Sequence, residues 1–349
     1  MQLSAKDPFR DSLQPLIWSI GSISGVLSED DERRLLMTTI MDLLRLVQMK
    51  ETKDDKAVVA GCLMYVIQQY PRFLKQHFKF LKTVINKNFE FMHEKHPGVQ
   101  DMACDTFKKI AKNCGGQLVI PQRIDNTDFP PYIQDIIMKM NVYMEELSPQ
   151  QKDVFYEAVA SVTKFERNFD RRIVLIQNMM YSLNETMKNV IKEGVSNAAA
   201  FHTNENLLKI KNVLRYNRVV CAVVGNDFIN QLTTYFQDFL DLFTLYSQAV
   251  TAVVREKGEI AVGYQQTRYQ IIIKREVIRI IQTFVENYKQ RDDGNGAIVD
   301  LKQLCGRFLP VLLADFRESP DCAKEPASLQ FLSVMIEKLK VVMRGVRDG

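Results

Sequence analysis

The sequence lacks both a long apolar run and a block of one charge. Its apolar stretches, such as Val219 to Val224, are far shorter than the roughly 20 residues that a helix needs to cross a bilayer. Lys and Arg outnumber Asp and Glu by only 46 to 42, for a net charge of +4. No aromatic-basic motif accompanies these charges. We therefore expect no membrane partner and no direct nucleic-acid partner, and the polar opening residues predict no secretory signal.

Paired cysteines are also missing. The six cysteines are scattered without the short spacings of a zinc site, and each lies in or beside an apolar helical pattern. This pattern is typical of reduced thiols that act as small core residues, and it indicates a cytosolic or nuclear protein. His93, His96 and Cys104 are the residues that come nearest to a metal-ligand set. A helix stop at Pro97-Gly98 follows the histidines and no fourth ligand is evident, so we expect no metal.

Motifs of catalysis are absent as well. We find no glycine-rich phosphate loop after a strand, no nucleophile elbow, no kinase motif set and no zinc-protease helix. Gly294-Asn295-Gly296 is read as a turn, and neighbouring carboxylates such as Glu145-Glu146 as a solvated helix end. The sequence therefore predicts a protein that is not an enzyme and has no cofactor.

Apolar residues recur with helical periodicity from one end of the chain to the other. No segment alternates apolar and polar residues over a length that predicts a strand. Ser28 and Ser148 are expected helix starts, Pro71 and Pro97 breaks, and Gly115-Gly116 a helix end. The longest early loop is expected at 117–128 and a flexible hinge at 292–296. The expected helices cover, by residue number, 29–50, 55–69, 72–95, 99–113, 130–147, 170–193, 203–224, 227–256, 265–290, 297–316 and 327–343.

These helices are expected to pair as antiparallel hairpins every 40 to 60 residues or so, the rhythm of helical-pair solenoids. The helix that begins Gly98-Val99-Gln100-Asp101 is similar to the second helix of a HEAT-type repeat. We predict an all-α HEAT-repeat solenoid of about six to seven repeats, forming one array over 1–349. Apolar patterns reach almost to both ends without polar capping helices, so the chain is expected to be a fragment of a longer protein.

The predicted helix 72–95 carries two apolar stripes where a docked surface helix needs one. One stripe is formed by Phe73, Phe80, Val84 and Phe91. The second, about 120° away, is formed by Leu74, Phe78, Leu81, Ile85, Phe89 and Met92. Such a helix either wedges between neighbours on both sides or offers one stripe to a partner.

Several segments resemble the exportin 1 family of karyopherins. The similarity is densest from Ile17 to Cys114, and it continues more thinly at Phe155 to Val159, Lys274 to Glu276 and Phe308 to Leu313. Segments that carry it are Trp18-Ser-Ile-Gly-Ser-Ile-Ser-Gly25, Gln69-Tyr-Pro-Arg-Phe-Leu-Lys75, Phe80-Leu-Lys-Thr-Val84, Phe89-Glu-Phe-Met-His-Glu94 and Gly98-Val-Gln-Asp-Met-Ala-Cys-Asp-Thr-Phe107. The resemblance implies the middle and later repeats of such a receptor.

The resemblance also implies a binding site. In that family, leucine-rich nuclear export signals bind a groove between the outer helices of two adjacent repeats, here within 29–113. The positions that match its lining are Ile40, Leu44, Val47, Ala60, Met64, Phe73, Phe80, Thr83, Val84, Lys87, Phe91 and Met102. Lys53, Lys56 and Lys87 are expected to favour acidic residues that flank such signals. The expected groove is an apolar slot that the chain's own side chains leave unfilled.

Two positions depart from the family. Val47 stands where many members have a reactive cysteine that electrophilic inhibitors attack, so we expect signal binding without covalent inhibition there. Asn88 stands where the family prefers an apolar residue.

The resemblance further implies partners and a location. The partners would be cargo proteins with leucine-rich export signals, Ran GTPase in its GTP form, mainly through repeats absent here, and nucleoporins. The location would be both nucleus and cytoplasm, through shuttling at the nuclear pore. The alternative interpretation is a non-catalytic helical-repeat scaffold with a closed groove.

Overall fold

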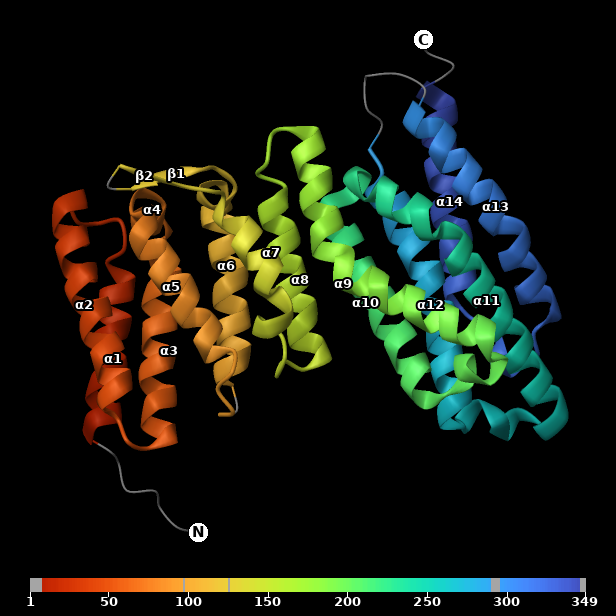
Figure 1. The fold of residues 1–349 in the computed structure, drawn as a ribbon, viewed down its shortest axis with the longest axis horizontal. Helices are drawn as coiled ribbons and strands as arrows, with labels where there is room; N and C mark the ends of the chain where they lie inside the picture. The colour runs from red at the N-terminus through yellow and green to blue at the C-terminus, as the bar shows by residue number, and fades with distance from the viewer. Residues whose placement is uncertain (1–7, 97, 125, 290–295, 346–349) are drawn as a thin grey trace. The chain divides into compact units, whose positions relative to one another are not determined.

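The computed structural model describes residues 8–96, 98–124, 126–289 and 296–345. Fourteen α-helices and one two-stranded hairpin occur over these residues (Figure 1). The chain divides into two compact units, residues 1–175 and 176–349, with the boundary inside helix α9. The all-α helical-repeat class predicted from the sequence is confirmed.

The first unit stacks successive helices joined by short turns. Its elements are α1 (Pro8–Ser22), α2 (Glu29–Met49), α3 (Lys53–Gln69), α4 (Pro71–Gln76), α5 (Phe78–Phe91), α6 (Val99–Val119), β1 (Gln122–Ile124), β2 (Thr127–Phe129), α7 (Tyr132–Tyr143), α8 (Pro149–Thr163) and the start of α9 (Phe169–Ser196).

The second unit continues in the same way. Its further elements are the 3₁₀ turn η1 (Ala198–His202), α10 (Asn204–Val224), η2 (Gly225–Phe228), α11 (Ile229–Lys257), η3 (Glu259–Gly263), α12 (Gln265–Asn287), α13 (Gly296–Glu318), η4 (Asp321–Ala323) and α14 (Ala327–Gly345). Over the described residues, no helix combines the length and apolarity that crossing a membrane requires.

Helix starts were well predicted. The Ser28 hydroxyl accepts a hydrogen bond from the Asp31 N–H and caps α2. Ser148 and Gln151 form a reciprocal capping box at the start of α8. The expected hinge at 292–296 lies outside the described residues, apart from Gly296, which begins α13.

The predicted single helix 72–95 is wrong, because the structure breaks it at His77. That residue leaves the helical region (φ −122°, ψ 75°) and separates α4 from α5. The break gathers three rings: Phe73 lies 4.6 Å from His77 and 5.2 Å, edge-on, from Phe80. The second apolar stripe contributes to the hydrophobic core, because its residues Leu81, Ile85 and Met92 are fully buried.

The predicted helix end at Gly115-Gly116 is also wrong, because α6 continues to Val119. Gly115 allows close packing, because a Cβ at this position would lie only 2.6 Å from the ring of Phe165, which follows α8. The loop expected at 117–128 contains a short antiparallel hairpin in which Gln122 pairs with Phe129. Sequence periodicity over three residues is too short to predict such strands.

Three consecutive charged residues organise the second unit around α12. The Lys274 Nζ lies 2.6 Å from Asp315 on α13, and both side chains are almost fully buried. The Arg275 Nε lies 2.9 Å from Glu325, just before α14. Glu276 accepts a hydrogen bond from Arg218 of α10 at 2.8 Å. Each residue of the triplet therefore ties α12 to a different neighbour.

The adjacent glycines of α6 provide a test of its packing. Gly115→Ala should lower stability, because the Phe165 ring has to move aside, at a cost of about 1 kcal/mol or more. Gly116→Ala should raise stability by roughly 0.5–1 kcal/mol, because its added Cβ lies 3.7 Å from that ring, an ordinary contact. Urea unfolding followed by circular dichroism measures both. Equal effects of the two substitutions would contradict the packing at Gly115.

The buried pair in the second unit gives a second test. Lys274→Met should cost about 3–5 kcal/mol in urea unfolding, because it strands the Asp315 carboxylate in the core. The double variant Lys274→Met/Asp315→Leu should recover much of this loss. The control Lys324→Met breaks an exposed pair with Asp321 and should cost less than about 1 kcal/mol. A loss in Lys274→Met no larger than in the control would rule out the buried pair.

Candidate functional site

Apolar side chains of α2, α3 and α5 meet in one region, which we call the α2–α5 seam. A small cavity of about 10 Å³ lies within the seam. Its wall is formed by Ile40, Leu44, Leu63, Met64, Ile67, Val84, Lys87, Asn88 and Phe91. This volume holds one water molecule at most, so the chain's own side chains fill the seam.

Six of the residues predicted to line a groove therefore meet around one point: Ile40, Leu44, Met64, Val84, Lys87 and Phe91. Phe73 is buried and packs against Phe80. Val47 and Ala60 are buried, and neither lines the seam cavity. Leu63 and Ile67 were missed, although they lie on the same face of α3 as Met64 and their helical spacing could have revealed them.

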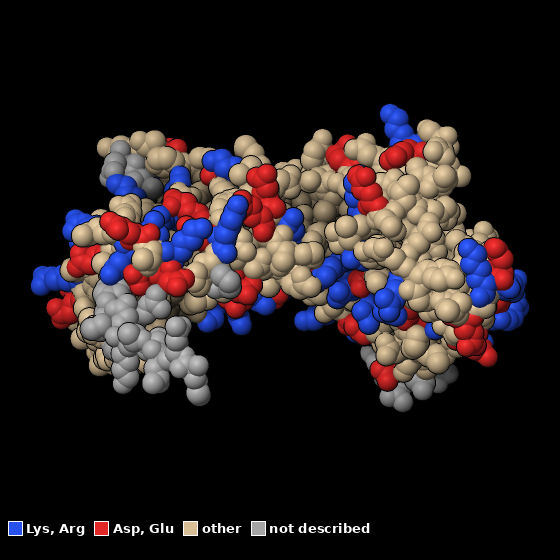
Figure 2. Space-filling view, turned by 90° about the horizontal axis from the view of Figure 1, so that it is seen from below, with Lys and Arg blue, Asp and Glu red and all other residues tan. Residues whose placement is uncertain are grey.

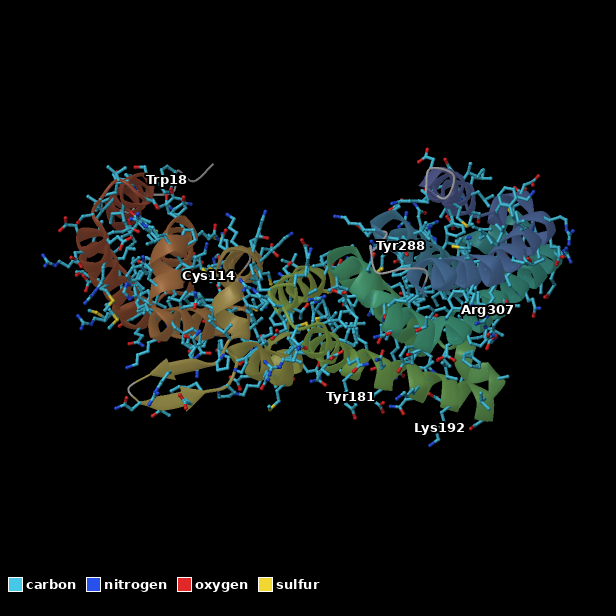
Figure 3. All side chains as sticks on the ribbon, turned by 90° about the horizontal axis from the view of Figure 1, so that it is seen from above. Trp18, Cys114, Tyr181, Lys192, Tyr288 and Arg307 are labelled. Atoms are coloured by element: carbon cyan, nitrogen blue, oxygen red, sulfur yellow. The ribbon has the colours of Figure 1, made fainter. Side chains whose placement is uncertain are left out.

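The remaining predicted residues are not brought to this cavity. Lys53 and Lys56 lie in the first turn of α3, and neither lines the seam. Met102 of α6 lines a different cavity of about 580 Å³ between α1, α3 and α6, together with Trp18 and Cys62. Figure 3 shows Trp18 and the β1–β2 hairpin on opposite sides of the first unit.

Polar atoms in the seam are few. The Lys87 Nζ lies 2.6 Å from Glu90 and 5.5 Å from the centre of the Phe91 ring, so this charge covers the apolar end of α5. Asn88 is buried, and its Nδ2 donates a hydrogen bond to the Ala103 carbonyl at 2.8 Å. Its Oδ1 has no partner among the described residues. Asn88 thus joins α5 to α6 through its Nδ2 and also forms part of the cavity wall.

No reactive thiol lies in the seam. Val47 is 8% exposed and carries no nucleophile. Burial raises the pKa of Cys62 to about 11 and that of Cys104 to about 12. Both thiols therefore stay protonated near neutral pH, and the thiol is a far weaker nucleophile than the thiolate.

The filled seam differs from the unfilled slot expected from the sequence. Phe73 and Phe91 are 2% and 4% exposed. Polar contacts also hold α2 against α4: Arg72 lies 2.5 Å from the buried Glu32, and Gln76 donates to Glu29 at 3.3 Å. Periodicity identifies an apolar stripe, but it cannot say whether neighbouring helices close over it.

An open cavity of about 610 Å³ adjoins the seam. It is bounded by α2, by the α4–α5 break and by the hairpin, and its wall contains the predicted groove residues Phe80 and Thr83. The hairpin wall was not predicted from the sequence, because the segment 117–128 was expected to be loop.

Comparison with known proteins extends the sequence resemblance. Residues 231–346 match the family described as "CRM1 C terminal", and residues 10–54 match "CRM1 / Exportin repeat 3". The chain is 37% identical to Exportin-1 of Schizosaccharomyces pombe over 333 residues, which is 95% of this chain and 30% of that protein. It is 35% identical to Protein EXPORTIN 1A of Arabidopsis thaliana over 342 residues, 98% of this chain and 31% of that protein.

A third relative, Exportin-1 of Drosophila melanogaster, is 34% identical over 330 residues, 94% of this chain and 30% of that protein. The chain thus spans about a third of the length of the curated relatives it matches. The two family matches lie toward opposite ends of the sequence, and the alignments with the relatives cover nearly all of the chain. This chain belongs to the exportin 1 family.

Proposed function

We propose that this chain is the cargo-binding part of a nuclear export receptor, and that a leucine-rich export signal binds along the α2–α5 seam. One observation carries the proposal. Six residues that the family resemblance assigns to the groove line a single cavity in this chain, which belongs to the exportin 1 family. An amphipathic peptide would insert apolar side chains between α2 and α5, the helix-in-groove mode.

Binding requires the seam to open first. Each large apolar side chain of the signal contributes roughly 1.5–3 kcal/mol on burial. Part of this offsets the cost of separating the helices that carry Ile40, Val84 and Phe91, which line the seam in the free chain. The apparent affinity is lowered by the fraction of molecules that are closed. We therefore propose weak signal binding by this chain alone.

In the whole receptor, a second ligand that favours the open seam would strengthen signal binding by the same factor by which the signal strengthens that ligand. We propose Ran in its GTP form for this role, with nucleoporins as further partners and shuttling between nucleus and cytoplasm as the setting. No chemical step is proposed, and the chain would act by binding alone.

A second candidate function is a helical-repeat scaffold whose seam never opens. The cavity of only about 10 Å³ within the seam favours it. The two candidates differ in one observable property, saturable binding of a short leucine-rich peptide.

Fluorescence anisotropy with a labelled leucine-rich signal peptide tests the proposal. We expect saturable binding that Phe80→Glu weakens at least tenfold, because a charge replaces an apolar side chain at the open end of the seam. The control Met138→Glu alters an exposed apolar residue on α7 and should leave binding unchanged. Absence of saturable binding, or equal binding by both variants, would favour the closed scaffold.

Thiol labelling provides a separate test. In the Cys322→Ser background, which removes the exposed thiol, an electrophile at pH 8 should leave Cys62 and Cys104 unmodified and signal binding intact. Their raised pKa values keep the thiolate fraction near one part in a thousand or less at that pH.

Val47 is itself only 8% exposed, so an adduct on Val47→Cys in this background, located by mass spectrometry, requires the seam to open. We expect this one adduct to form, and to reduce peptide binding. Rapid modification of Cys62 or Cys104 with loss of peptide binding in the Val47 protein would overturn this account.

A further inference from the structure

The open cavity beside the seam has a wall chemistry of its own. Its residues are Arg33 and Met37 of α2, Gln76 to Phe80 around the α4–α5 break, Thr83 of α5, and Gln122 and Arg123 of β1. We call this cavity of about 610 Å³ the hairpin pocket. Among the described residues that line it, there are four basic or titratable nitrogen side chains and no carboxylate.

The hairpin pocket and the seam lie on one line. On α5, Phe80 and Thr83 of the pocket precede Val84 and Lys87 of the seam by one helical turn. On α2, Met37 precedes the seam residue Ile40 by a turn. From Phe80 to Phe91 the distance along a helix is roughly 16 Å, at 1.5 Å per residue. A peptide laid in an opened seam therefore has one end at the hairpin pocket.

The hairpin is held in place by aromatic contacts. The Lys82 Nζ lies 5.5 Å from the Phe129 ring centre and 5.1 Å from that of Tyr132. Tyr132 packs edge-on against Phe78 and donates a hydrogen bond to Asn86. The contact of Lys82 with Phe129 joins β2 to α5, and β1, which carries Arg123, pairs with β2.

Among the described residues, the carboxylates near Arg33 and Arg123 have other partners or are exposed. Glu32 is engaged by Arg72, and Glu29 accepts a hydrogen bond from Gln76. The Arg123 Nε lies 3.8 Å from Asp128, but both side chains are more than 70% exposed. An exposed pair of this kind contributes little, and a stronger acceptor replaces it readily. A guanidinium binds carboxylate or phosphate oxygens through paired N–H donors.

We propose that the hairpin pocket binds an anionic side chain, a carboxylate or a phosphate, in the segment that adjoins the export signal. This inference rests on the proposed function and gives it a determinant of specificity outside the apolar signal. Signals with an acidic or phosphorylated neighbouring segment are then preferred over signals with a neutral one. Phosphorylation of that segment in the cargo raises its affinity, because it adds up to two negative charges and three acceptor oxygens.

The experiment compares one signal peptide with versions extended at either end by Ser-Ser, Glu-Glu or two phosphoserines. Anisotropy titrations at low salt should show three- to tenfold tighter binding for Glu-Glu at one end only, and a larger gain for phosphoserine. The Ser-Ser extension should change nothing. In the variant Arg33→Gln/Arg123→Gln the gains should disappear, while the unextended peptide binds as before.

The control Arg317→Gln removes an exposed arginine of the second unit and should keep every gain. Arg33 and Arg123 are exposed, and unfolding curves check that the double variant folds. If the unextended peptide binds but acidic extensions give no gain, or a gain that survives in the double variant, the hairpin pocket is wrong and the proposed function stands. If the unextended peptide does not bind at all, both are overturned.

Discussion

The first unit depends on helix α3 being buried on nearly every side. It packs against α1, α2, α5 and α6, and Val59, Leu63, Met64 and Val66 are each at most 1% exposed. A helix in this position needs apolar residues around most of its circumference, unlike a surface helix with one apolar stripe. Because α3 forms the floor beneath α2 and α5, it fixes where an apolar seam can exist between them.

In the second unit, the helix in the equivalent central position is α12, and it carries charged residues. Helix α12 packs against α10, α11 and α14, and the Lys274–Asp315 pair lies inside this packing. Desolvating two charges costs several kcal/mol, which their attraction offsets only with good geometry and further hydrogen bonds. Asp315 has such bonds, because the hydroxyls of Ser247 and Ser319 both reach it. A charged pair with fixed partners allows only one axial register between the two helices, whereas an apolar contact tolerates small shifts of one helix along the other.

Sequence periodicity and capping predicted the class of the fold, most helices and the two stripes of residues 72–95. The errors came from single residues and short segments. The break at His77 depends on ring packing between Phe73 and Phe80, which are neighbours only in space. Gly115 resembled a helix end but makes room for Phe165, a partner 50 positions away. The cavity wall formed by the hairpin could not be predicted, because strands of three residues carry no periodic signal. Charge alone could not locate a binding surface, because acidic and basic side chains are interspersed on the face of the first unit that Figure 2 shows.

Closure of the seam has a physical consequence for the free chain. An open apolar slot would expose Ile40, Leu44 and Phe91 to water and favour association with other exposed apolar surfaces. In the closed seam Ile40 and Phe91 are only 1% and 4% exposed, and the adjoining hairpin pocket is open to solvent. A charged group attracts its partner over about 10 Å in physiological salt, whereas apolar contact needs near-touching surfaces. In the proposed mode of binding, an approaching peptide would therefore meet the charged pocket before any apolar contact exists. The free energy gained there would be available to separate α2 from α5, and apolar side chains of the signal would then line the opened seam.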